Sequence, residues 1–129
     1  MTIVVGYVPT REGEVALARA GEEARLRHAP LVVVSSTRGE SRVAPDLPQT
    51  SALQMSVAEH KAAGVDVEVR HLEQVKDPAE AITSVAEEVK ASLIVLGAKR
   101  RSPVGKLLLG STVQRVLLDT DCAVLVVKP

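Results

Sequence analysis

The chain has 129 residues, 46% of them apolar, with 16 basic and 16 acidic side chains. Zero net charge excludes a protein drawn to nucleic acid or membranes by its overall field. The lack of Phe and Trp also argues against aromatic platforms for nucleic-acid bases. One cysteine rules out an internal disulfide, and no signal-peptide or membrane-span pattern is present. We therefore expect one soluble, cytoplasmic domain over residues 1–129.

The predicted elements alternate between strands and helices. Uninterrupted runs of Val, Ile and Leu are typical of strands buried on both faces, whereas apolar residues three and four positions apart indicate helices. The segment 65–69 alternates apolar and charged residues, which predicts a strand with one wet face at an edge of the sheet. In chain order we expect strand 3–5, helix 11–28, strand 31–34, helix 50–63, strand 65–69, helix 78–90, strand 93–96, helix 111–119 and strand 123–127.

This alternation predicts an α/β fold, in which an open parallel sheet of five strands carries helices on both faces. Ligands of such sheets bind beyond the carboxyl ends of the strands, at the point where the strand order reverses. The turns after the first and fourth strands, 7–10 and 97–110, are therefore the first candidates for a site. A long loop over 38–51 follows the second strand at the same edge, and it is either a lid or a plain surface loop.

The segment 97–112 carries the strongest sign of chemistry. It leaves a buried strand, contains three glycines and enters a helix near Ser111. Glycine allows a ligand to approach the backbone, and a helix N-terminus offers free N–H groups with a partial positive charge. The segment holds four basic side chains and no acid, namely Lys99, Arg100, Arg101 and Lys106. These features predict a phosphate-binding loop, and the alternative is a solvated basic connection.

The spacing of Gly97 and of the pair Gly110-Ser111 is that of the nucleotide loop Gly-x2-Gly-x9-Gly-Ser/Thr. On this motif the chain resembles the universal stress protein family. The resemblance continues through Ile-Val-Val-Gly at the start, Asp-Pro-Ala-Glu-Ala-Ile in the middle and Cys-Ala-Val-Leu-Val-Val near the end. It implies a Rossmann-type three-layer sandwich of the adenine nucleotide alpha hydrolase type, with strand order 3-2-1-4-5.

The same resemblance implies a homodimeric, non-catalytic stress-response or signalling protein that binds ATP or another adenine nucleotide, with Mg²⁺ held mainly by phosphates and water. The dimer would form through the C-terminal strand 123–127. The matching positions place Tyr7, Val8 and Pro9 beside the adenosine, Ser36 near the base, Gly97, Lys99 and Arg100 in the phosphate loop, and Gly110, Ser111 and Thr112 at the helix N-terminus.

Two positions depart from the family pattern. Arg100 stands where the motif has its second glycine, and Val8 stands where ATP-binding members commonly have an acid that faces the nucleoside. The Arg100 guanidinium could itself hold phosphate, whereas Val8 has no polar side-chain atom. The sequence thus leaves open a nucleotide-free dimeric interaction scaffold. A slow ATPase or phosphotransferase is a further alternative, although no residue pattern supplies a general base, a catalytic nucleophile or a metal-ligand set.

Overall fold

Five parallel strands form one sheet, in the order β3-β2-β1-β4-β5, in the computed structural model of the chain. The structure describes residues 1–36, 47–72, 77–99 and 104–129. The strand order and the α/β class predicted above are confirmed. The elements are β1 (Thr2–Tyr7), α1 (Arg11–Arg27), β2 (Leu31–Ser36), α2 (Leu47–Ala62), β3 (Val67–Leu72), α3 (Pro78–Glu88), β4 (Ala91–Gly97), α4 (Ser111–Asp119) and β5 (Ala123–Val127).

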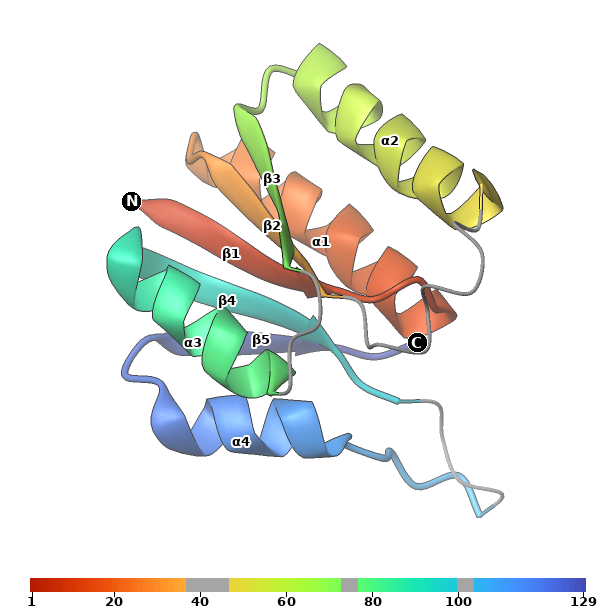
Figure 1. The fold of residues 1–129 in the computed structure, drawn as a ribbon, viewed down its shortest axis with the longest axis vertical. Coiled ribbons are helices and arrows are strands. Elements are labelled where there is room, and N and C mark those ends of the chain that lie inside the picture. The colour runs from red at the N-terminus through yellow and green to blue at the C-terminus, as the bar shows by residue number, and fades with distance from the viewer. Residues whose placement is uncertain (37–46, 73–76, 100–103) are drawn as a thin grey trace.

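Two helical layers cover the sheet, with α1 and α2 on one face and α3 and α4 on the other (Figure 1). The alternation of side chains along β1 explains this arrangement, since Ile3 and Val5 pack in the core under α1 and α2 while Val4 packs in the core under α3 and α4. All three are fully buried. The continuous apolar run of β1 is therefore buried on both faces, as expected for a central strand of a covered parallel sheet.

Local capping explains where two of the helices begin. Thr10 is extended, and its Oγ1 accepts a hydrogen bond from the Gly13 N–H at 3.2 Å, so α1 starts at the next residue. Asp77 caps α3 in the same way through the Glu80 N–H at 3.3 Å. Partial burial by itself raises the pKa of the Asp77 carboxyl. Hydrogen bonds from Arg115 and from the Glu80 N–H outweigh this effect and keep the pKa of Asp77 below its ordinary value.

The clearest differences between the sequence predictions and the structure concern α2, β3 and β5. Helix α2 begins at Leu47, inside the segment predicted as a loop over 38–51, while residues 38–46 lie outside the described ranges. Strand β3 occupies 67–72 rather than 65–69, because β2 pairs with it from Val67 onward. Strand β5 lies at an edge of the sheet, as the predicted strand order places it, but it is only partly buried, although its continuous apolar run indicated burial on both faces. Strand β3 lies at the other edge, as the alternating pattern predicted. In the part of the chain that the structure describes, no helix combines the length and apolarity needed to cross a membrane.

Candidate functional site

A cleft of about 460 Å³ opens at the carboxyl ends of β1 and β4, which is within the usual range for small-molecule sites. The chain leaves β1 toward α1 on one face and leaves β4 toward α4 on the other, so the cleft lies where the connections diverge (Figure 1). Its lining comes from the β1–α1 turn, the end of β4, and the first turns of α3 and α4. The lining residues are Gly6, Tyr7, Val8, Pro9, Thr10, Glu12, Gly13, Pro78, Ile82, Leu96, Gly97, Lys99, Gly110, Ser111, Thr112 and Val113.

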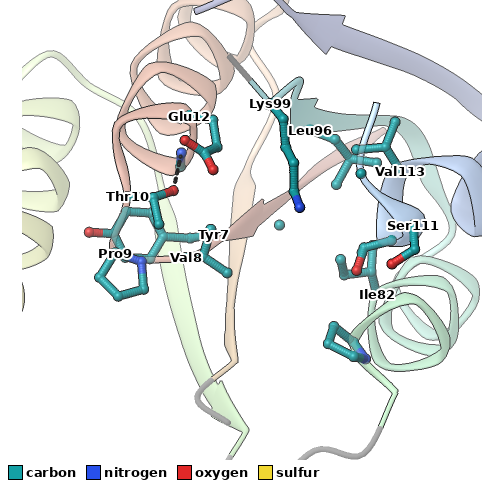
Figure 2. Close-up of a pocket in the computed structure, with 16 residues that line it drawn as sticks. Tyr7, Val8, Pro9, Thr10, Glu12, Ile82, Leu96, Lys99, Ser111 and Val113 are labelled. Carbon is teal, nitrogen blue, oxygen red and sulfur yellow. Dashed lines mark hydrogen bonds between the residues drawn. The ribbon is translucent and has the colours of Figure 1, made fainter. Parts of the chain in front are cut away.

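One wall of the cleft is the tight turn between β1 and α1. The Val8 carbonyl accepts a hydrogen bond from the Thr10 N–H at 2.8 Å, which closes the turn. A Cβ on Gly13 would lie 1.8 Å from the same carbonyl oxygen, so the turn requires glycine there. Val8 is 37% exposed and presents an apolar surface to the cleft. Figure 2 shows Tyr7, Val8, Pro9, Thr10 and Glu12 together on this side.

The floor of the cleft is closed by a second backbone contact. A Cβ on Gly97, at the end of β4, would lie 2.2 Å from the Glu12 carbonyl oxygen and 2.8 Å from its carbonyl carbon. The first turn of α1 therefore rests directly on Gly97. The first glycine of the sequence motif thus joins two elements that are far apart in the chain.

The positive features of the cleft converge near the start of α4. Lys99 forms an isolated antiparallel bridge with Leu108, so these two residues of the segment lie side by side. The Lys99 side chain runs past Gly110, where a Cβ would lie 3.3 Å from Cε, and its ammonium group reaches into the cleft between the two walls (Figure 2). Helix α4 begins after Gly110, which has no side chain to accept a hydrogen bond from the first N–H groups of the helix. An ammonium group and uncapped helical N–H groups at one place form a setting that favours an anion.

The opposite wall is mostly apolar and combines three elements. Ile82 of α3, Leu96 of β4 and Val113 of α4 line it beside the exposed Ser111 hydroxyl (Figure 2). The cleft can therefore hold a ligand that carries a flat or apolar group between Val8 and Ile82 and a negative group near Lys99.

The structure brings together most of the residues expected from the sequence. Eight of them line the cleft, namely Tyr7, Val8, Pro9, Gly97, Lys99, Gly110, Ser111 and Thr112. Ser36 ends β2, but its side chain lies outside the described part, and Arg100 also lies outside the described residues.

Thr10 lies in a turn that the sequence marked as a candidate, although it was not singled out. The lining residues that sequence reasoning missed are Gly6, Glu12, Gly13, Pro78, Ile82, Leu96 and Val113. Ile82 and Val113 follow the helical apolar pattern of core residues, so their sequence gave no sign of a second role. For Glu12 a signal did exist, since an acid in the first turn after strand one falls near the same edge as the phosphate loop.

Tyr7 belongs to both the core and the cleft. Its side chain is only 3% exposed, and its hydroxyl donates a hydrogen bond of 2.7 Å to Glu14 Oε1. Burial disfavours the phenolate, and the hydrogen bond and charge of Glu14 disfavour it further, so the pKa of Tyr7 lies well above its ordinary value of 10.0.

We expect the Tyr7 hydroxyl to stay protonated in the folded protein at pH values where a free tyrosine ionises. The raised pKa means that the neutral phenol stabilises the fold fully below pH 10.0, and that this stabilisation is lost as the pH rises above that value. Tyr7 is the only tyrosine, so ultraviolet absorbance of tyrosinate reports on it alone. Tyr7→Phe should remove this part of the alkaline loss of stability. Native protein that titrates like free tyrosine would contradict the account.

Among the described residues, no group of three or more His, Cys, Asp or Glu side chains is placed to hold a metal ion. The polar side chains of the cleft are instead Tyr7, Thr10, Glu12, Lys99, Ser111 and Thr112. Hydroxyls, one ammonium and one carboxylate suit a polar organic anion better than a metal.

Comparison with known proteins agrees with this geometry. Residues 1–128 match the universal stress protein family. A universal stress protein of Mycolicibacterium smegmatis is 37% identical over 98% of this chain and 97% of its own length. A universal stress protein solved in complex with cAMP has a TM-score of 0.74 and 31% identity, over 99% of this chain and 96% of that one. The universal stress protein of Archaeoglobus fulgidus in complex with dAMP has a TM-score of 0.71 and 31% identity, over 98% of this chain and 96% of that one. The chain is a member of the universal stress protein family.

Proposed function

We propose that this chain binds an adenine nucleotide in the cleft between β1 and β4 and acts as a non-catalytic, nucleotide-responsive protein. The observation that carries the proposal is the convergence of the Lys99 ammonium with the uncapped N-terminus of α4 in one cleft. Two related structures, solved with cAMP and with dAMP, support an adenine nucleotide as the class of ligand.

The arrangement of the cleft supports a definite orientation of the nucleotide. The phosphates would lie near Lys99 and accept hydrogen bonds from the backbone at Ser111 and Thr112. The adenosine would lie against Val8 and Pro9 on one side and Ile82 on the other, where the surfaces are apolar. Because Val8 has no polar side-chain atom, base recognition at that position would use backbone groups. Arg100, where the motif has glycine, would add a guanidinium to the phosphates.

Binding would act through the loop that carries these groups, and not through turnover. Differential affinity for two states of the loop is enough to report nucleotide concentration to a partner. Mg²⁺ would arrive with ATP, held mainly by phosphates and water. We expect no ATP hydrolysis above background in the purified protein.

We propose further that the protein is a cytoplasmic homodimer. Strand β5 lies at an edge of the sheet, and its run Ala-Val-Leu-Val-Val is apolar, which favours pairing with another strand. The Val127 carbonyl accepts a hydrogen bond from the Ala98 N–H at 2.9 Å, so the backbone polar groups of Val127 point toward β4. Those of the preceding residue, Val126, therefore point toward the free edge. Val126→Pro should therefore preserve the subunit fold and convert a dimer into a monomer in sedimentation experiments. A monomeric wild-type protein would refute the dimer.

The proposal that the protein is cytoplasmic rests on its single cysteine, which suits a reducing compartment.

The binding proposal is tested by thermal unfolding with AMP, ADP, ATP and cAMP, with and without Mg²⁺. A nucleotide at about 100 times its Kd adds about 2.7 kcal/mol to the free energy of unfolding. For a chain of this size the unfolding temperature then rises by several degrees. If no nucleotide at millimolar concentration changes the unfolding temperature, the proposal fails and the nucleotide-free dimeric scaffold becomes the better account.

A further inference from the structure

Two hydrogen-bond acceptors on the wall formed by the β1–α1 turn are already engaged within the turn. The Val8 carbonyl accepts from the Thr10 N–H, and Thr10 Oγ1 accepts from the Gly13 N–H. A ligand that carries hydroxyl donors and lies against this wall therefore needs another acceptor.

Glu12 supplies that acceptor. It is the one carboxylate among the described lining residues, and it is half-buried beside Gly97 and on the same wall as Val8 (Figure 2). Within the described ranges, none of the ion pairs involves Glu12. Glu14, the other acid in this helical turn, differs because the Tyr7 hydroxyl already binds it. The Glu12 carboxylate is thus a charged acceptor of this turn that no ion pair within the described ranges engages.

The two charges of the cleft come from different places in it. Glu12 belongs to the β1–α1 wall, whereas Lys99 reaches toward the start of α4. A ligand with phosphate near Lys99 and neutral donors near Glu12 satisfies both, and phosphate placed beside Glu12 would be repelled. In a 5′-ribonucleotide such as AMP the ribose is next to the phosphate and carries two hydroxyl donors.

We propose that Glu12 binds the ribose hydroxyls of the nucleotide and makes the site select ribonucleotides over dideoxyribonucleotides, an inference that rests on the function proposed above. A carboxylate forms strong hydrogen bonds with hydroxyl groups. A ligand without those hydroxyls leaves the half-buried carboxylate with no partner, and sites of this kind discriminate strongly against the ligand that lacks the donor. Because Glu12 is only half-buried, we expect about a 10-fold preference, at the lower end of what such sites reach.

Calorimetric titration of wild type, Glu12→Ala and Glu22→Ala with AMP, 2′,3′-dideoxy-AMP and IMP tests the proposal. Glu22 lies on the same helix, is exposed and is outside the cleft, so its variant is the matched control. Wild type and the control should bind AMP about 10-fold more tightly than dideoxy-AMP, and Glu12→Ala should bind the two equally. Thermal unfolding of each variant verifies that it is folded.

The outcomes separate this inference from the proposed function. If wild type binds none of the three, the proposed function fails and this inference fails with it. If wild type binds AMP but shows no preference over dideoxy-AMP, or Glu12→Ala keeps the preference, the nucleotide site stands and the role of Glu12 is overturned. If Glu12→Ala changes only the preference for AMP over IMP, the carboxylate recognises the base and the ribose assignment is wrong.

Discussion

Replacement of Gly97 by alanine is expected to destabilise the protein by about 3 kcal/mol, because overpacking against a rigid neighbour costs this much. The new Cβ would lie 2.2 Å from the Glu12 carbonyl oxygen, which belongs to helical backbone and cannot rotate away. The first turn of α1 must then move off the end of β4. Thermal unfolding should show a drop of about 10 °C, and calorimetry should show loss of AMP binding because both walls of the cleft shift.

Gly110→Ala is the matched control, since it adds the same methyl group to the same segment. Its Cβ would meet only the end of the Lys99 side chain, at 3.3 Å from Cε, and Gly110 has an ordinary φ of −69°. A flexible side chain can move by a few tenths of an ångström, so we expect a loss below about 1 kcal/mol. Equal destabilisation by the two substitutions would show that the close contact between Gly97 and α1 is not the cause of the stability loss in Gly97→Ala.

Ser111→Asp should abolish nucleotide binding while it leaves the fold intact. A carboxylate at the first position of α4 interacts favourably with the helix dipole, by about 0.3–1 kcal/mol, so the unfolding temperature should stay the same or rise. The same carboxylate occupies the place proposed for phosphate and repels it. Calorimetry with AMP should therefore show an affinity at least about 100-fold below that of wild type, through charge repulsion and loss of the helix N-terminus as an anion site.

Ser111→Ala is the control for the charge. It keeps the backbone N–H groups and loses only the hydroxyl, so we expect less than about a 10-fold loss of affinity. If Ser111→Asp binds AMP as tightly as wild type, the start of α4 is not where the phosphate binds.

Much of the fold could be predicted because the central strands are covered on both faces. Continuous apolar runs such as Leu93–Leu96 indicate such strands directly, and all four of these residues are buried. The predicted bounds of a strand were wrong where its apolar pattern was weak, as in β3. Val65 continues the alternating pattern of β3, but its N–H binds the His60 carbonyl at the end of α2, so the strand starts later.

The cleft could be predicted only in part, because segments far apart in the sequence come together to form it. Gly97 and Gly110 were found from their spacing. Ile82 was not found, because its spacing from the other apolar residues of α3 is that of a helix packed on a core. Only the packing of α3 beside β1 brings it to the cleft. Glu12 escaped notice because an acid in a first helical turn is also explained by the helix dipole.

Titration of ¹⁵N-labelled protein with AMP, followed by amide chemical shifts, tests the central claim most directly. The account predicts that the largest shifts occur at Gly97, Ser111 and Thr112, with smaller ones at Val8 and Glu12. Residues of the groove between α2 and β3, such as Val57 and Val69, should be unaffected. Shifts confined to that groove, or none at saturating AMP, would contradict a nucleotide site between β1 and β4.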